Sequence, residues 1–154
     1  MRIDVLKRNI YLVIVIVVVS LWPINTLVIE TVEGTHWCPF PGSIRLEISY
    51  THSVSLTKVQ DTYEVTGKGL YAKEEKWQSS LAGQPLDYEK TEGGFFVKEM
   101  DTFLGREWRY WFIPLNNVTI KVNGKPIISN FKREGIVSFR VIKMPLFFTI
   151  FRRC

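Results

Sequence analysis

Metal-ligating side chains are scarce in this sequence, which has two histidines and two cysteines among its 154 residues. A zinc-type site needs three or four convergent ligands from His, Cys or carboxylate side chains. One histidine, His52, belongs to a predicted β-hairpin, so only His36 remains free to bind a metal. We therefore predict neither a bound metal nor a cofactor.

Other common signals are missing as well. The formal net charge is +5, but the basic residues do not cluster with aromatic residues in the way that indicates a nucleic-acid groove. We therefore predict no nucleic-acid partner. No nucleophile elbow, internal repeat or low-complexity linker is present, and helical periodicity is absent after residue 22. With 46% hydrophobic and 14% aromatic residues, the chain suits one domain with a substantial core.

One long apolar run lies near the N-terminus. Ile10–Trp22 contains a single polar residue, and Lys7 and Arg8 stand immediately before it. Counted over Val5–Ile24, the segment reaches the roughly 20 helical residues that cross a hydrocarbon core. The basic flank predicts a cytoplasmic N-terminus, with the rest of the chain on the extracytoplasmic side of the cell membrane. No small-x-small cleavage signal is found around Trp22–Thr26, which favours an uncleaved transmembrane helix over a removed signal peptide.

Residues 26–154 have the pattern of an all-β extracytoplasmic domain, and residues 1–25 form the basic flank and the anchor. Short β-prone runs separated by Gly, Pro and Asn predict a small antiparallel β-sandwich or a partly open barrel. Asn123-Gly124 is the strongest hairpin signal. Gly34 and Pro39–Gly42 are expected to break regular structure, and Leu146–Phe151 to extend the last strand. The expected strands are Thr26–Val32, Ser43–Val54, Val59–Val65, Leu70–Trp77, Phe95–Met100, Trp108–Ile113, Val118–Val122, Lys125–Ile128 and Ile136–Ile142.

The clearest alternation of apolar and polar residues lies in Ser43–Val65. A loop at Ser55–Lys58 would join two antiparallel strands into a hairpin. In that register His52 pairs with Asp61, which places an imidazole beside a carboxylate on the face that looks into the core. The further pairs are Val54 with Val59, Tyr50 with Tyr63 and Ile48 with Val65.

Two short motifs carry a resemblance to a known family. They are the strand end Tyr50-Thr51-His52-Ser53-Val54 with the later Asp61 and Tyr63, and the loop Leu81-Ala82-Gly83-Gln84-Pro85. Over roughly Leu27 to Ile128 the chain resembles the domain-of-unknown-function family 1850, small extracytoplasmic proteins found beside TRAP-type transporter components of the TAXI subclass. The family pattern has Glu at the positions of Ser55 and Asp61, and Gly at Leu81. The resemblance implies a location and a transporter neighbourhood, and it implies no activity.

Three roles stay open for the His52–Asp61 pair. The two buried groups offset each other's desolvation, which would make the pair structural. Alternatively, the hairpin and the loop converge on a ligand at one end of the sheet, and the candidate ligand-binding residues are His52, Ser53, Asp61, Ala82, Gly83 and Pro85. The third role is general-base catalysis by His52, oriented by Asp61, in a hydrolase-like enzyme. Ser53 follows His52 directly in a strand and points to the opposite face, so we assign no catalytic residue.

Two further features concern packing. Cys38 and Cys154 would both lie outside the membrane, where disulfides persist, and they form a candidate disulfide whose closure the sequence leaves open. Trp108, Tyr110, Trp111 and Phe112 are expected to pack in the core and at a sheet edge rather than to form a ligand cage.

Taken together, these patterns favour a non-catalytic, membrane-anchored extracytoplasmic accessory or interaction module. Its expected partners are the membrane, through the N-terminal helix, and membrane or solute-binding subunits of a TRAP/TAXI-type transporter. The alternative is the enzyme that uses His52 as a general base.

Overall fold

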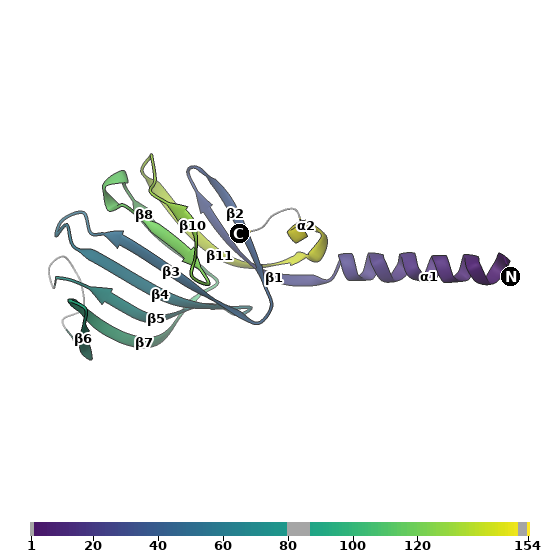
Figure 1. The fold of residues 1–154 in the computed structure, drawn as a ribbon, viewed down its shortest axis with the longest axis horizontal. Coiled ribbons are helices and arrows are strands. Elements are labelled where there is room, and N and C mark those ends of the chain that lie inside the picture. The colour runs from purple at the N-terminus through teal and green to yellow at the C-terminus, as the bar shows by residue number, and fades with distance from the viewer. Residues whose placement is uncertain (1, 80–86, 151–153) are drawn as a thin grey trace.

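The computed structural model describes residues 2–79, 87–150 and 154. Within them, a long N-terminal helix leads into two antiparallel β-sheets (Figure 1). The four-stranded sheet has the order β2 (Gly34–Phe40), β1 (Pro23–Thr31), β11 (Gly135–Pro145) and β8 (Glu107–Phe112). The seven-stranded sheet has the order β10 (Lys125–Ser129), β9 (Thr119–Val122), β3 (Ser43–Thr51), β4 (Lys58–Thr66), β5 (Gly69–Trp77), β7 (Phe95–Gly105) and β6 (Lys90–Glu92). A short 3-10 turn, η1 (Pro114–Asn116), follows β8.

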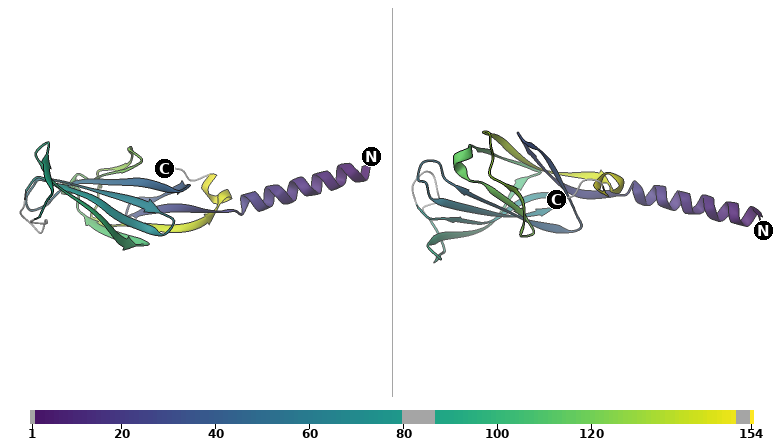
Figure 2. Two further views of the ribbon diagram at one scale, coloured as in Figure 1. Left: turned by 90° about the horizontal axis from the view of Figure 1, so that it is seen from below. Right: turned by 45° about the horizontal axis from the view of Figure 1, so that its top comes forward.

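The two sheets pack face to face as a sandwich, seen as two layers in Figure 2. Alternate residues of each strand point inward, as the period of two in the sequence predicts. From the seven-stranded sheet, Leu46, Ile48 and Val65 are fully buried, and Leu27 and Phe139 are their counterparts in the other sheet. Of the two architectures expected from the sequence, the sandwich is the one observed.

Between β7 and β8 the chain passes from one sheet to the other through a single residue. β7 of the seven-stranded sheet ends at Gly105, β8 of the four-stranded sheet begins at Glu107, and only Arg106 lies between them. Arg106 is held by β11: its carbonyl accepts from the Val141 N–H at 2.9 Å, and its guanidinium Nη2 donates to the Val141 carbonyl at 3.0 Å. Gly105 has φ +104°, which favours glycine. This sharp crossing folds the aromatic strand β8 back over β5 and β7, which it contacts.

The N-terminal helix α1 (Arg2–Ser20) projects from one end of the sandwich (Figures 1 and 2). The apolar run predicts a helix that continues to Ile24, and that prediction is wrong. β1 begins at Pro23, and Ile24 is already paired with Met144 of β11. Among the described residues, no helix combines the length and the apolar character needed to cross a bilayer, so the expected transmembrane helix is not found.

Two other expectations about secondary structure are wrong. The break expected at Gly34 and Pro39–Gly42 is found only at Pro41 and Gly42, which separate β2 from β3, whereas Gly34–Phe40 forms the regular strand β2. β2 lies at the edge of its sheet and has a neighbouring strand on one side only. Proline, which has no backbone N–H to donate, is tolerated in such an edge strand, and this accounts for Pro39. The C-terminal run Leu146–Ile150 forms the short helix α2 and does not extend β11. The Leu146 N–H donates to the Trp22 carbonyl at 2.9 Å, which turns the chain back against the end of α1.

Candidate functional site

A buried carboxyl group lies in the middle of the seven-stranded sheet. Asp61 belongs to β4, the central strand, and its side chain is only 7% exposed. Its Cα partners are Ile48 on β3 and Glu75 on β5. Because it alternates with the outward-facing Gln60 and lies between Val59 and Tyr63 on the inner face, Asp61 points between the two sheets.

The hydrogen-bond partner of Asp61 comes from the opposite sheet. Tyr110 on β8 donates its hydroxyl hydrogen to Asp61 Oδ2 at 2.5 Å. The Tyr110 hydroxyl also bonds the hydroxyl of Tyr63, which is the next inward-facing residue on β4. The ring of Tyr50 lies edge-on to that of Tyr110, with centroids 6.1 Å apart. Three phenols and one carboxyl group therefore form a polar cluster inside the sandwich, the Asp61 cluster (Asp61, Tyr50, Tyr63 and Tyr110).

Burial dominates the electrostatics of the Asp61 cluster. Desolvation raises the pKa of Asp61 from 3.8 to about 7; the hydrogen bond from Tyr110 opposes this rise, and the charge of Glu75 adds to it. Burial and the neighbouring Asp61 charge also raise the pKa of each of the three tyrosines, so they remain protonated donors. Desolvation likewise raises the pKa of Glu75, against the attraction of Lys98.

The Asp61 cluster lines a cavity of about 300 Å³. This volume lies at the lower end of the range for small-molecule sites. Asp61 and Glu75 supply acidic groups, and Trp108 supplies an aromatic wall that is 37% exposed. The full lining is Tyr50, Asp61, Tyr63, Ala72, Glu74, Glu75, Met100, Leu104, Trp108 and Tyr110. Among these residues there are polar groups, apolar walls and no basic side chain.

A larger hollow lies on the solvent-facing side of the same sheet. It measures about 520 Å³ and includes Arg45, Glu64 and Lys73 in its lining. These charges already have partners: Lys73 Nζ lies 2.7 Å from Asp101, and Arg45 Nε lies 2.8 Å from Glu47. Exposed ion pairs of this kind indicate an ordinary solvated surface. The Asp61 cavity, with its buried carboxyl group, is the better candidate for a functional site.

A family model described as a domain of unknown function, DUF1850, matches residues 46–127, more than half of the chain. The chain belongs to the DUF1850 family. No curated protein and no solved structure matches it. The DUF1850 match contains every member of the Asp61 cluster, together with Glu75 and Trp108. Helix α1, both cysteines and α2 lie outside the matched residues.

Within the DUF1850 motif, the predicted contact between His52 and Asp61 is wrong. The Cα partner of Asp61 is Ile48, four positions earlier than His52. Strand β3 ends at Thr51, and His52 starts a loop that runs to Thr57. There the His52 Nδ1 atom accepts hydrogen bonds from the N–H groups of Val54 at 3.2 Å and Ser55 at 3.4 Å. His52 therefore stabilises a loop, and the exposed Ser53 lies in that same loop.

The remaining residues of the predicted ligand site divide in two. Asp61 is part of the cavity, whereas His52 and Ser53 are not among its lining residues. Ala82, Gly83 and Pro85, from the second DUF1850 motif, lie outside the described residues. In the described part of the chain, no group of three or more His, Cys, Asp and Glu side chains could hold a metal ion.

Tyr110 and Trp108 were missed as site residues. The aromatic run around them predicts packing, and part of that packing is present: Tyr110 stacks on Phe112 with ring centroids 5.2 Å apart. Period-two alternation places Trp108, Tyr110 and Phe112 on one face, and that signal was available in the sequence. Their meeting with Asp61 depends on how the two sheets pack, and the local pattern contains no such information.

A disulfide joins Cys38 of β2 to Cys154, with Cα atoms 5.0 Å apart. Cys38 is part of the hydrophobic core, and Cys154 packs against that core. The bond ties the C-terminus to the edge strand of the four-stranded sheet, away from the Asp61 cavity.

Proposed function

We propose that this DUF1850 protein is a non-catalytic accessory module, attached to a membrane on its extracytoplasmic side, that binds a small ligand in the Asp61 cavity. One observation carries the binding part of this proposal. Asp61, which is 7% exposed and lines a cavity of about 300 Å³, has a single hydrogen-bond donor among the described residues, Tyr110. Buried polar groups normally have all their partners, so a group left incomplete beside a cavity favours a ligand.

Membrane attachment is supported by the surface of α1. From Ile10 to Val19, each side chain is 46–72% exposed, and all of these residues are apolar or aromatic. A helix that is apolar all round is stable only when something covers it, and a lipid bilayer is the simplest cover for a helix that projects from its domain (Figure 1).

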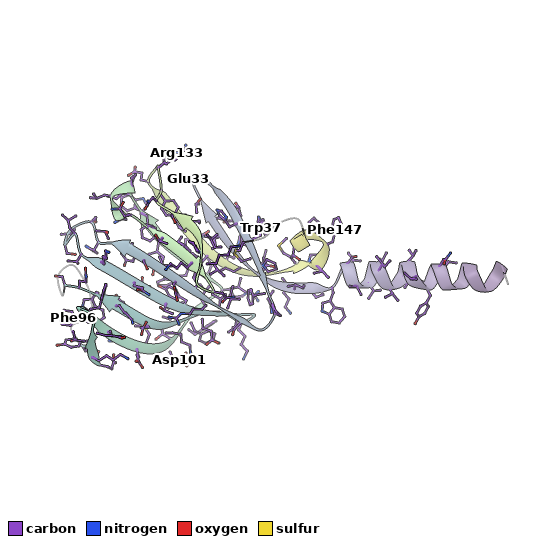
Figure 3. The ribbon with its side chains drawn as sticks, in the orientation of Figure 1. Glu33, Trp37, Phe96, Asp101, Arg133 and Phe147 are labelled. Atoms are coloured by element: carbon purple, nitrogen blue, oxygen red, sulfur yellow. A yellow bond between two sulfur atoms is a disulfide. The ribbon has the colours of Figure 1, made fainter. Side chains whose placement is uncertain are left out.

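The junction between α1 and the sandwich continues this apolar surface. Trp22 is 64% exposed, and Phe148 of α2 is 53% exposed. Phe147, also on α2 (Figure 3), packs against Phe148 with ring centroids 5.8 Å apart. Aromatic side chains are enriched where proteins meet the membrane interface, so the junction suits the headgroup level of the same bilayer.

Attachment is tested by a double substitution in α1, Val15→Asp with Val17→Asp. Each acidic residue opposes burial in lipid by roughly 2.5–3.5 kcal/mol at the centre of a helix. We expect the double variant to leave the membrane pellet, while the wild-type chain stays in it after carbonate washing. The matched control is Val54→Asp, because Val54 is 78% exposed in the β3–β4 loop, far from α1. Equal retention of wild type and double variant would contradict attachment through α1.

Ligand binding is tested with the full-length protein in detergent, by thermal denaturation in the presence of a library of small metabolites. A ligand at 100 times its dissociation constant stabilises a protein by about 2.7 kcal/mol, which is easily detected. We expect at least one compound to raise the Tm of the wild type and not that of Asp61→Asn. If no compound raises the Tm, or if every active compound is equally active on Asp61→Asn, the cavity is not the binding site.

The transporter partner rests on the family resemblance. Affinity purification of the full-length chain from its native membranes, followed by mass spectrometry, is expected to enrich TRAP-type membrane or solute-binding subunits over an unrelated membrane protein used as bait. Repeated purification without such subunits would contradict this part of the proposal. The enzyme alternative is not carried forward, because its general base was to be oriented by Asp61 and His52 bonds its own loop instead.

A further inference from the structure

The Asp61 carboxyl group has an incomplete set of partners. Its Oδ2 atom accepts from Tyr110, and no other hydrogen bond to this carboxyl group comes from the described residues. The free oxygen belongs to a side chain that lines the cavity. A group placed in that cavity would find an acceptor that is held in position by β4 and by the Tyr110 contact.

A second acid stands directly across from the first. Glu75 on β5 is the Cα partner of Asp61, and both line the cavity. Residues paired in this way on one face have Cβ atoms about 4.5–5.5 Å apart, so their carboxyl groups can share one ligand atom. The Cα partner of Glu75 on β7 is Lys98, but the Lys98 ammonium group lies 2.6 Å from Asp87.

The charge of the cavity is therefore of one sign. Its described lining residues include Asp61 and Glu75, and also Glu74, which pairs with Thr62 on the opposite face of the sheet; no basic residue is among them. The Glu74 carboxylate forms an ion pair with Lys76, whose Nζ atom lies 3.5 Å from Glu74 Oε1. The other walls are Trp108, Tyr110, Met100 and Leu104. Aromatic faces attract cations, and the apolar walls suit a short carbon chain.

From this arrangement we propose that the Asp61 cavity binds a small organic ammonium ion, such as a primary alkylamine. The ammonium group lies between Asp61 and Glu75 and donates hydrogen bonds to both carboxyl groups, and the carbon chain packs against Trp108. This inference rests on the proposed ligand-binding function and names the chemical class of the ligand. An anion would lie against the two acids with only the Lys98 ammonium group near Glu75 as a counter-charge, and a neutral alcohol could donate a hydrogen bond but carries no charge to balance the acids.

Binding of such a cation is coupled to the release of a proton. In the free protein, burial holds the pKa of Asp61 at about 7, so below that pH the group is mostly a neutral acid. An ammonium ion beside it favours the carboxylate, so Asp61 loses its proton to solvent as the cation enters. Affinity should thus rise with pH between about 5 and 7. The titratable groups that face Asp61 are Tyr50, Tyr63, Glu75 and Tyr110, and the tyrosines stay protonated in this range.

Three probes of equal chain length test the charge requirement: butylammonium, 1-butanol and butyrate. Titration calorimetry on the full-length protein in detergent is expected to give at least tenfold tighter binding of butylammonium than of 1-butanol, and no binding of butyrate. Asp61→Asn and Glu75→Gln are each expected to weaken butylammonium binding at least tenfold. Asp101→Asn is the matched control, because the Asp101 side chain (labelled in Figure 3) is 71% exposed and Asp101 is not one of the cavity-lining residues; this variant should bind like the wild type.

The outcomes separate this inference from the function on which it rests. If 1-butanol or butyrate binds as tightly as butylammonium, or if the half-buried Glu75→Gln variant keeps full affinity, the inference is overturned. If none of the three probes binds while other library compounds stabilise the wild type through Asp61, the ligand class is wrong and the binding function stands. If no compound of any kind binds, both are wrong.

Discussion

The hydroxyl group of Tyr110 lies 2.5 Å from Asp61 Oδ2 and joins the edge strand of one sheet to the central strand of the other. β8 has a backbone partner, β11, on one side only, so side-chain contacts across the sandwich must hold its aromatic face in place. The bond to Asp61 is a polar contact of this kind between strands that are 49 residues apart in sequence. Tyr110 and Trp108 both belong to β8, and both line the cavity.

Replacing Tyr110 with Phe should destabilise the fold and raise the pKa of Asp61. The change removes the donor to Asp61 and the contact with the Tyr63 hydroxyl, and leaving a buried acceptor unpaired typically costs about 1–3 kcal/mol. Because the Tyr110 hydrogen bond lowers the pKa of Asp61, that pKa should rise above about 7 in Tyr110→Phe. Denaturant unfolding and carboxyl-carbon NMR titration measure the two effects.

The matched control for Tyr110→Phe is Tyr50→Phe. Tyr50 packs against the ring of Tyr110 but neither donates to Asp61 nor accepts from it. We expect this variant to change the free energy of unfolding by less than about 1 kcal/mol. If the two variants lose the same stability, the Tyr110 hydroxyl has no special role as a donor.

The stability of the protein should fall between pH 4 and pH 7 because of Asp61. The folded-state pKa of about 7 lies above the ordinary value of 3.8, so the folded state binds more protons in this window than the unfolded state does. The contribution of Asp61 to the free energy of unfolding is then fully present below pH 4 and is lost as the pH rises to 7. Above pH 7 it no longer changes. The difference in pKa corresponds to roughly 4 kcal/mol.

The Asp61→Asn variant isolates this contribution. Asn keeps an acceptor for Tyr110 and cannot ionise, so its free energy of unfolding should lack the Asp61-dependent fall. Denaturant unfolding at pH 4.5, 6 and 8 should show that the free energy of unfolding of Asp61→Asn increases relative to that of the wild type as the pH rises. Parallel pH profiles for the two proteins would mean that Asp61 ionises as freely in the fold as in water.

Local patterns predicted which residues face the core, and they left the register open. The period of two correctly places Ile44, Leu46 and Ile48 inward, and it also correctly places Asp61 on the inner face. A register shift by an even number of residues keeps every side chain on its face, so hydrophobicity alone could not distinguish the pair His52–Asp61 from the pair Ile48–Asp61. The length of the connecting loop decides the register.

That loop length depends on contacts that no pattern records. The β3–β4 connection runs from His52 to Thr57, with Leu56 at a positive φ of 55° and the Leu56 N–H donating to the His52 carbonyl at 2.9 Å. By contrast, the Asn123-Gly124 hairpin was predicted correctly, because both residues adopt the positive φ that this turn requires. Tyr110 reaches Asp61 only through the crossing at Arg106 and the packing of two sheets, which depend on tertiary structure.

His52 should matter for its loop and not for the cavity. His52→Ala removes the acceptor for the Val54 and Ser55 N–H groups, at an expected cost of about 1 kcal/mol. His52→Asn supplies a short side-chain acceptor of the kind that turns of this type use, and it should recover most of that loss. Both variants should bind butylammonium within twofold of the wild type. If His52→Ala folds and loses binding, the ligand site lies in the β3–β4 loop and not at Asp61.

Opening the Cys38–Cys154 disulfide should cost stability without affecting the cavity. The bond spans 116 residues of sequence, and on a chain-entropy treatment a closed loop of this size stabilises the fold by about 5 kcal/mol. We expect the double variant Cys38→Ser with Cys154→Ser to lose about this much, as measured by denaturant unfolding. Reduced wild-type protein should match the double variant, since both free the C-terminus from β2.

Butylammonium binding at low temperature should be unchanged, because neither cysteine lines the Asp61 cavity. Unfolding curves that coincide with and without reductant would show that the bond adds nothing to the stability of the sandwich.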